Sequence, residues 1–539
     1  MHTESPTVNA RVIEETKRRR TFAIISHPDA GKTTLTEKLL LYGGAIQLAG
    51  SVRSRRAQRK ATSDWMEIEK QRGISVTSTV LQFDYQGLVL NLLDTPGHDD
   101  FSADTYRTLM AADSAVMLID NAKGVETQTK KLFAICKERG VPIFTFINKL
   151  DHEGIGPLAL LTEVETTLGI RSVPMNWPIG QGREFMGVCD RETQLVSLFD
   201  RVAHGSKRAE EEVLALDDPR LKDRIGEAAL STLIDELGLL DIAGEPIDEA
   251  RILSGELTPV FFGSALTNFG VELFLNRFIQ LAPPPQPRAS EGSMVPSSAP
   301  FSAFIFKIQA NMDPNHRDRI AFMRVVSGQF DKDMEVVNTR TGAQLRLSRP
   351  QRLFAQDRET VEEAFPGDIV GLSNPGAFRL GDTLSADPAI HYSEVSTFVP
   401  ETFCRIHNQD PGRFKHYLKG IEQLCEEGLV DLFYDRRGQR LEVVLGAVGA
   451  LQFEVVLHRL LGEYGVRANV EPLGYEHIRW VTGPEAKIAA THWGSGASAL
   501  EDRHGQKVVL VGTEWNLKWL QDQNPDLKFH STPPLSSPA

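Results

Sequence analysis

The stretch IISHPDAGKTTLTEKLLL, residues 24–41, decides the fold of the N-terminal part of the chain. An apolar strand-like run breaks into a tight loop, and a helical pattern begins at Lys32. A strand, a loop and a helix N-terminus together point several free backbone N–H groups at one position, where the helix dipole adds positive potential. This arrangement predicts a phosphate-binding loop made of Ser26, His27, Pro28, Asp29, Ala30, Gly31, Lys32, Thr33 and Thr34.

Two side chains of this loop have the types that nucleotide phosphates require. Lys32 is expected to reach the β- and γ-phosphates, and the Thr33 hydroxyl is expected to bind Mg²⁺. The usual pattern is G-x-x-x-x-G-K-[ST], whereas this chain has Ser26 at the first position. On the loop alone, a capped helix after a sharp turn stays an alternative.

Composition indicates a globular chain. Its 539 residues predict about three or four domains, and 41% hydrophobic with 24% charged residues is typical of a water-soluble fold. The formal net charge of −13 argues against a protein that coats nucleic acid or binds specific DNA sequences. The basic run RSRRAQRK, residues 53–60, is the local exception, with a solvated loop as the simpler interpretation.

Targeting and redox features are lacking in the sequence. The N-terminal residues carry no signal-peptide pattern, and no apolar run is long enough to span a membrane, so a cytoplasmic protein without a membrane partner is expected. The four cysteines show no C-x-x-C spacing, so neither a zinc site nor a disulfide framework is predicted.

A second motif follows the run LVLNLLDTPGHDDF, residues 88–101. The apolar strand ends in Asp94, which is expected on the Mg²⁺ side of a nucleotide. Thr95, Pro96 and Gly97 follow, and glycine permits a backbone N–H to approach the γ-phosphate closely.

A third motif identifies the base. The strand-like run VPIFTFINKLDHEG ends in Asn148, Lys149, Leu150 and Asp151. A carboxylate at Asp151 can accept hydrogen bonds from the N1–H and N2–H₂ groups of guanine, and adenine has no matching donors. The run LTPVFFGSAL then delivers Ser264, Ala265 and Leu266, whose backbone can meet the guanine O6.

The order of these motifs predicts the fold class. Each follows an apolar strand, as expected for a doubly wound α/β domain that binds GTP or GDP at the carboxyl ends of parallel strands. A P-loop nucleoside kinase would share residues 24–41, but it would need neither Asn-Lys-x-Asp nor the β-rich region that follows.

The segment SDWMEIEKQRGISVTSTV, residues 63–80, carries a family resemblance. Arg72-Gly73-Ile74-Ser75 and Asp-Thr-Pro-Gly-His resemble motifs of the translational GTPases, such as elongation factors Tu and G. Within that group the chain is most similar to the class II peptide chain release factors. The resemblance implies GTP/GDP and Mg²⁺ as cofactors, and the ribosome and class I release factors as partners. The basic run 53–60 adjoins this segment and becomes our candidate contact for ribosomal RNA phosphates.

The resemblance also assigns roles to two residues. It implies that Ser75, where the family usually has Thr, binds Mg²⁺ through its hydroxyl when GTP is bound. It implies that His98 positions the attacking water and is the catalytic residue. Without that context His98 reads as a surface histidine.

The domain organisation is predicted from changes of pattern. We expect a GTPase domain over 1–282 with an insertion at about 155–257, and a Pro- and Ser-rich linker over 283–300. Short strand-like runs predict an elongation-factor-type β-barrel over 301–390. Strand, helix, two strands, helix and strand predict a split βαβ domain over 391–530, before a disordered tail over 531–539.

Two apolar stripes are expected in the core of the split βαβ domain. The first is Phe414, Tyr417, Leu418, Ile421, Leu424 and Cys425, and the second is Phe453, Val456, Leu457, Leu460 and Leu461.

Two absences favour a role in termination without peptide release by the protein itself. Gly-Gly-Gln, with which class I release factors act on peptidyl-tRNA, occurs nowhere in the printed sequence. Elongation factor G carries two further domains after its third, which disfavours translocation here. Another translational GTPase similar to elongation factor G and a GTP-gated scaffold without hydrolysis remain the alternatives.

Overall fold

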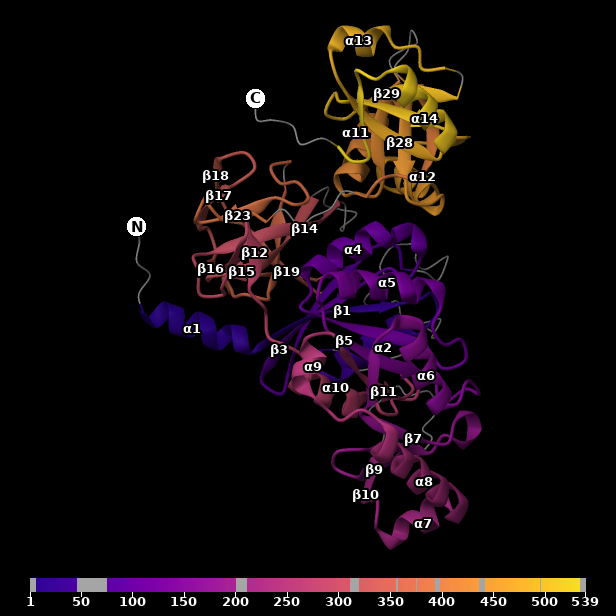
Figure 1. Ribbon diagram of the computed structural model, residues 1–539. Helices are drawn as coiled ribbons and strands as arrows, with labels where there is room; N and C mark the ends of the chain where they lie inside the picture. Colours follow the sequence, from indigo (N-terminus) through magenta and orange to yellow (C-terminus); the bar gives the residue numbers. More distant parts are fainter. Residues whose placement is uncertain are drawn as a thin grey trace.

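The computed structural model describes residues 6–45, 75–199, 211–310, 319–354, 357–374, 376–392, 398–435, 442–494 and 496–533. The basic run 53–60 and the end of the predicted tail, 534–539, lie outside these residues. The N-terminal α/β domain forms the centre of the molecule in Figure 1, a β-barrel domain lies beside it, and a C-terminal α/β domain lies above both.

The N-terminal domain is built on a seven-stranded sheet with strand order β2-β3-β1-β4-β5-β11-β6, in which only β2 is antiparallel to its neighbour. The strands are β1 (Arg19–Ser26), β2 (Thr79–Tyr85), β3 (Leu88–Asp94), β4 (Ser114–Asp120), β5 (Ile143–Asn148), β6 (Arg171–Pro174) and β11 (Leu257–Phe262). The main helices are α2 (Lys32–Tyr42), α4 (Ser102–Ala111), α5 (Thr127–Glu138), α6 (Pro157–Leu168) and α10 (Val271–Leu281).

The central strands are buried on both faces, as near-continuous apolar runs require. Two apolar cores, one on each face, hold the helices against the sheet. The predicted doubly wound fold is confirmed. It brings the loops after β1, β3, β5 and β11 to one edge of the sheet.

Residues 155–257, expected as one insertion, divide into two parts. Helix α6 and strand β6 complete the main sheet, because β6 pairs in parallel with β11. The rest contains a separate antiparallel sheet, and Trp177 anchors it by donating from Nε1 to Glu236 at 2.7 Å. Its elements are β7 (Asn176–Ile179), β8 (Gly187–Asp190), β9 (Leu195–Phe199), β10 (Glu211–Ala215), α7 (Pro219–Ile225), α8 (Glu227–Ala243) and α9 (Glu249–Leu253).

The barrel domain follows a short hairpin inside the predicted linker, formed by β12 (Arg288–Ser290) and β13 (Ser293–Val295). Its strands are antiparallel, as the alternating pattern predicts. They are β14 (Ser302–Ala310), β15 (Arg319–Ser327), β16 (Phe330–Asp331), β17 (Glu335–Asn338), β18 (Ala343–Arg346), β19 (Pro350–Phe354), β20 (Asp357–Thr360), β21 (Glu363–Ala364), β22 (Ile369–Ser373) and β23 (Thr383–Ser385).

Buried charges join the barrel domain to the N-terminal domain. Arg324 donates to the Asp113 carboxylate at 2.5 Å, and both side chains are almost fully buried. Arg19 donates to Asp368 at 2.8 Å in the same interface. Removing one partner of such a pair leaves an uncompensated buried charge, so these contacts hold the two domains in a fixed arrangement. The N-terminal helix α1 (Pro6–Lys17) adds an exposed pair from Arg11 to Glu363.

The C-terminal domain begins with the predicted split βαβ order: β24 (Thr402–Asn408), α11 (Phe414–Glu426), β25 (Asp431–Asp435), β26 (Glu442–Ala447), α12 (Leu451–Tyr464) and β27 (Ala468–Leu473). The chain then extends the same sheet to eight strands. The added elements are β28 (His477–Thr482), α13 (Glu485–Ala490), β29 (Ala497–Asp502), β30 (Lys507–Val511), α14 (Glu514–Gln523) and β31 (Lys528–His530).

Two of the expected core residues in this domain are exposed. Phe414, at the first turn of α11, is 49% exposed and lies near Tyr417, while Leu461 on α12 is 55% exposed. The face of each helix that contacts the sheet is narrower than the predicted stripe, so Phe414 and Leu461 at the margins of the stripes face solvent. The central members, among them Ile421, Leu424 and Val456, are buried as expected.

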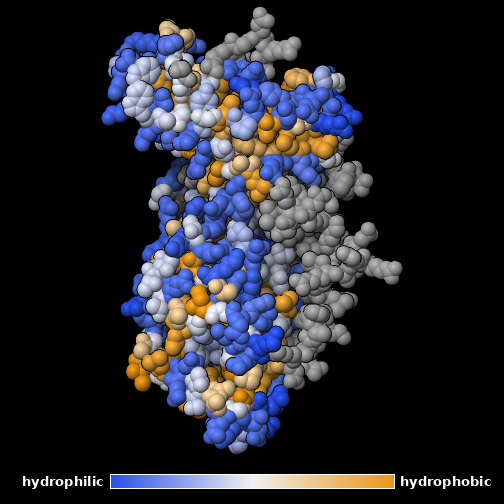
Figure 2. Space-filling view, turned by 90° about the vertical axis from the view of Figure 1, so that its right-hand side faces the viewer, coloured by the Kyte–Doolittle hydropathy of each residue, from blue (hydrophilic) through white to orange (hydrophobic). Residues whose placement is uncertain are grey.

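The face in Figure 2 is mostly hydrophilic, with small apolar patches. Among the helices that the structure describes, none combines the length and apolarity that a membrane span requires.

Candidate functional site

A cavity of about 600 Å³ opens at the edge of the sheet where the loops after β1, β3 and β5 meet. The cavity brings together residues from all four predicted motifs and Ser75, the predicted Mg²⁺ ligand. The predicted site residues that line it are His27, Pro28, Asp29, Gly31, Lys32, Thr33, Thr34, Ser75, Gly97, His98, Asn148, Lys149, Asp151 and Leu266.

Eight predicted residues do not line the cavity. They are buried behind its walls: Ser26, Ala30, Asp94, Thr95, Pro96, Leu150, Ser264 and Ala265. Thr95, for example, donates from its hydroxyl to the Ile24 carbonyl at 2.7 Å, which ties the loop after β3 to β1. These residues lie behind the walls of the cavity and help to shape them.

The loop after β1 has the backbone of an anion-binding turn. Asp29 and Gly31 have φ angles of 65° and 97°, in the left-handed region, and α2 starts directly afterwards at Lys32. Such a turn before a helix N-terminus directs successive N–H groups to one point. Across the cavity, a Cβ added to Gly97 would lie 3.0 Å from Lys32 Nζ, so glycine permits the close approach of the two loops.

Asn148 connects three of the loops. Its Nδ2 donates to the Ala30 carbonyl at 2.8 Å, and its Oδ1 accepts the N–H of Ala265 at 2.8 Å. The side chain is 2% exposed, and it links the turn after β1 to the loop after β11 through the end of β5. This amide therefore contributes to holding the three loops in one arrangement, together with the hydrogen bond from the Leu150 N–H to the Gly263 carbonyl.

A charged pair lies beside this amide. Lys149 has a φ of 67°, and its Nζ donates to the Asp29 carbonyl at 2.5 Å and to Asp120 at 2.8 Å. Burial alone would raise the pKa of Asp120, but hydrogen bonds from Lys149 and from the Ala122 backbone outweigh it and lower that pKa. The Asp120 carboxylate is therefore ionised and fixes Lys149.

Asp120 was not predicted from the sequence, nor were Ala122, His152 and Glu153, which also line the cavity. A signal existed for Asp120, because the apolar run SAVMLID ends in it in the same way that the run before Asp94 does. For the other three no motif marks the position.

Asp151 has an acceptor that is free for a ligand. Its Oδ1 is buried, and no group in the described part of the chain donates to it. His152 contacts the other oxygen, Oδ2, at 3.4 Å. A buried carboxylate oxygen without a donor is costly unless a bound molecule supplies one.

Two of the three histidines that line the cavity, His27 and His98, differ in burial. Burial lowers the pKa of His27, against the opposing effect of Glu126 3.3 Å from Nε2, so this ring is neutral at pH 7. His98 is more open, with 37% of its side chain exposed, and its Nδ1 accepts the Asp100 backbone N–H at 3.3 Å.

Ser75 lines the cavity at the start of a segment, residues 75–78, that is hydrogen-bonded to α4 and to β14. Three residues further on, the Ser78 N–H donates to Asp104 of α4 at 2.7 Å, and Lys307 of β14 donates to the Ser78 carbonyl. This segment therefore connects the cavity to α4 and to the barrel domain.

Comparisons with known families agree with this architecture. Residues 17–284 match the elongation factor Tu GTP-binding domain, residues 300–387 match elongation factor G domain 2, and residues 392–521 match the C-terminal domain of class II release factor RF3. A solved structure from Thermus thermophilus shares the fold, with a TM-score of 0.68 at 22% identity over 87% of this chain and 71% of that one.

Full-length relatives are more specific. A protein of Symbiobacterium thermophilum is 55% identical over 96% of this chain and 98% of its own length, and one of Gloeobacter violaceus is 54% identical over 98% and 100%. A third, of Rippkaea orientalis, is 52% identical over 99% of both chains. All three are named peptide chain release factor 3.

The fold and the cavity thus define a GTP-binding protein of the translational GTPase class. Within that class, the chain belongs to the peptide chain release factor 3 family.

The bridging role of Asn148 leads to a prediction. Replacing Asn148 by Ala leaves the Ala30 carbonyl and the Ala265 N–H without their partner, at a cost of about 1–3 kcal/mol. We expect a lower melting temperature and roughly tenfold weaker GDP binding, because the loops lose their common link. Asn276→Ala on α10 removes the acceptor of two hydrogen bonds, from Tyr85 and Gln86, outside the cavity and is the control. Unchanged GDP affinity in Asn148→Ala would show that the loops are held by other contacts.

Proposed function

We propose that this protein hydrolyses GTP on the ribosome and thereby promotes the dissociation of class I release factors after peptide release. The observation that carries the proposal is the meeting of the Lys32, Gly97 and Asp151 loops in one cavity, in a chain whose C-terminal residues match the class II release factor domain. The cytoplasm, where ribosomes translate, is its proposed site of action.

The cavity fits a guanine nucleotide at both ends. The left-handed turn at Asp29 and Gly31 and the Lys32 ammonium suit the phosphates. At the other end, the free Oδ1 of Asp151 suits a donor on the guanine edge, and the backbone near Leu266 suits O6.

Hydroxyl oxygens of Thr33 and Ser75 are the proposed Mg²⁺ ligands, since both residues line the phosphate end of the cavity and hard oxygen donors suit this ion. When bound, Mg²⁺ neutralises charge on the β- and γ-phosphates. Asp94 lies behind the wall at the end of β3, so its proposed contribution to the ion is indirect.

His98 is the proposed catalytic residue. Its ring lines the cavity, and its Nδ1 is engaged by the Asp100 N–H, which leaves Nε2 to orient water for attack on the γ-phosphate. Phosphoryl transfer depends on positioning and charge stabilisation, so the rate of hydrolysis is expected to depend on the orientation of this ring.

Two alternatives differ from this proposal in one step each. A factor similar to elongation factor G would move tRNA and messenger, and the match of residues 392–521 to the release factor C-terminal domain favours termination. A scaffold without hydrolysis would keep the cavity but not need the ordered histidine at its edge.

Lys32 and His98 have separable effects in this mechanism. Lys32→Ala removes the phosphate-binding ammonium and should abolish measurable GTP binding, whereas His98→Ala should leave GTP affinity within about twofold. Ribosome-stimulated turnover of His98→Ala should fall by a factor of about 10² or more, as for the loss of a water-positioning group. Wild-type turnover by the His98 variant would contradict the assigned role.

Base recognition can be tested at Asp151. Asp151→Asn replaces an acceptor by a donor and should shift preference from GTP to xanthosine triphosphate, which carries an oxygen where guanine has its amino group. Competition binding with the two nucleotides measures the shift. If the variant preferred GTP as strongly as the wild type does, Asp151 would not face the base.

The termination role calls for a release assay with a limiting class I factor. We expect the protein with GTP to raise the number of peptides released per class I molecule, and to leave a single-turnover release step unchanged. The comparison with a non-hydrolysable GTP analogue separates hydrolysis from binding. Unchanged class I turnover, or movement of the messenger by one codon, would refute the termination role and leave the GTPase assignment intact.

A further inference from the structure

Asp100 lies two residues after His98 and forms a direct contact between the N-terminal and C-terminal domains. Its Oδ2 accepts the backbone N–H of Leu451 at 2.7 Å, and Leu451 is the first residue of α12. Ala450, which precedes α12, has no side chain that could cap the helix. A carboxylate at a helix N-terminus satisfies a free N–H and interacts favourably with the helix dipole, so Asp100 supplies this cap from another domain.

The same residue holds the His98 ring. The Asp100 backbone N–H donates to Nδ1 of His98 at 3.3 Å, and His98 caps the short 3₁₀ turn Asp99–Phe101. Asp100 therefore meets the ring through its backbone N–H and, at 3.5 Å, through its carboxylate Oδ1, while Oδ2 is anchored on α12. A displacement of α12 would therefore move the turn Asp99–Phe101, which orients the His98 ring.

An apolar cluster supports this contact. Val76, Phe101 and Val455 pack together and are each at most 2% exposed. Val76 follows Ser75, Phe101 follows Asp100, and Val455 lies one turn into α12. The segment at the cavity, the His98 turn and the C-terminal domain therefore meet in one small core.

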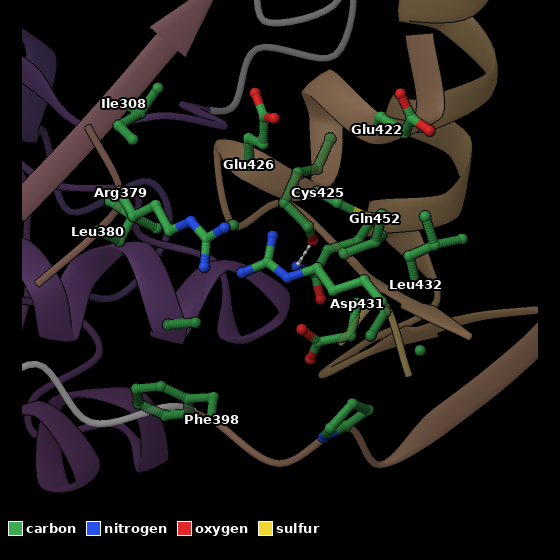
Figure 3. A pocket seen from close by; sticks show the side chains of 18 of the residues that line it. Ile308, Arg379, Leu380, Phe398, Glu422, Cys425, Glu426, Asp431, Leu432 and Gln452 are labelled. Carbon is green, nitrogen blue, oxygen red and sulfur yellow. Dashed lines mark hydrogen bonds between the residues drawn. The ribbon is translucent and has the colours of Figure 1, made fainter. Parts of the chain in front are cut away.

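Next to the contact lies a cavity of about 450 Å³ between α4, the barrel domain and the C-terminal domain. Figure 3 shows it, with Arg379 and Leu380 on the barrel side and Cys425, Asp431 and Gln452 on the C-terminal side. Other contacts cross the same junction: Arg107 of α4 donates to the Gly428 carbonyl at 3.2 Å, and Arg319 of β15 pairs with Glu426 of α11. The Asp100 contact joins α12 directly to the His98 turn.

We infer that Asp100 is a positioning residue through which the C-terminal domain holds His98 in its hydrolytic orientation. The domain that matches class II release factors thus acts on the nucleotide site of its own chain. The inference rests on the proposed function, in which His98 orients the attacking water.

A substitution at Gly449 can disrupt the same contact from the C-terminal domain. A methyl group at this position would occupy the space that the Asp100 carboxylate fills. Gly449→Ala should therefore push the carboxylate off the Leu451 N–H without any change in the N-terminal domain sequence. In an Asp100→Ala background the space is empty, so the same methyl group should have no further effect.

The closing experiment measures GTP turnover with saturating ribosomes for Asp100→Ala, Gly449→Ala and the double variant. Each single variant should lose on the order of tenfold in kcat, with GDP affinity within about twofold of wild type, because orientation is lost and binding is not. The double variant should be no slower than Asp100→Ala alone. Asp100→Asn keeps an acceptor oxygen and should retain most of the activity.

Matched controls lie beside each substitution. Asp99→Ala removes an exposed pair with Lys131, and Gly462→Ala adds a methyl group to α12 where no atom lies within 4 Å. Both should turn over GTP at close to the wild-type rate, since exposed pairs contribute little.

Hydrogen exchange of the ribosome-free protein reports the contact itself. The Leu451 amide should exchange faster in Asp100→Ala and Gly449→Ala than in wild type and the two controls. If wild type showed no stimulation by ribosomes, the proposed function would fail, while exchange would still test the contact. Normal turnover in Gly449→Ala, additive losses in the double variant, or unchanged exchange at Leu451 would each overturn the inference.

Discussion

The buried amide of Asn148 is the contact on which the nucleotide site depends. It donates to the Ala30 carbonyl and accepts a hydrogen bond from the Ala265 N–H, so two loops that are far apart in the sequence contact the same side chain. The sheet brings these loops to the same edge, but parallel strands alone leave the loop conformations open. An amide with one donor side and one acceptor side fixes both neighbours at once, which neither a carboxylate nor an ammonium could do.

The same site is joined to the other two domains through the segments around Ser75 and His98, at its proposed phosphate end. Lys307 from the barrel reaches the Ser78 carbonyl, and Leu451 from the C-terminal domain reaches Asp100. Hydrolysis of GTP removes the γ-phosphate that these segments would contact, so both domain interfaces lie where the chemical change occurs.

The interface of Arg324 with Asp113 is different, because it is buried, charged and remote from the cavity. Breaking it would strand a charge in a dry environment, whatever nucleotide the cavity holds. The barrel and N-terminal domains are therefore expected to move as one body, against which the C-terminal domain changes position.

Much of the fold could be predicted because its signals are local. Motifs such as the Lys32 loop and Asn148–Asp151 end apolar strands, and strand ends are visible in one sequence. The split βαβ order was also correct, since helix and strand periods differ. The domain limits and the assigned roles of the site residues stay predictions. The features that the sequence did not predict depend on tertiary contacts. Asp100 meets α12 only in the folded chain, because its partner Leu451 lies 351 positions away. Asp120 gains its role from its ion pair with Lys149, and no motif describes the left-handed backbone of Lys149.

Because the segments around Ser75 and His98 connect the cavity to the other domains, we expect the bound nucleotide to set the position of the C-terminal domain. Single-molecule energy transfer between a dye on α6 and a dye on α14 tests it directly, and the four native cysteines are buried, which favours labelling at introduced sites. The account predicts one narrow distance distribution with a non-hydrolysable GTP analogue and a shifted or broader one with GDP, because the segments at Ser75 and His98 lose the γ-phosphate. Identical distributions with the two nucleotides would contradict it.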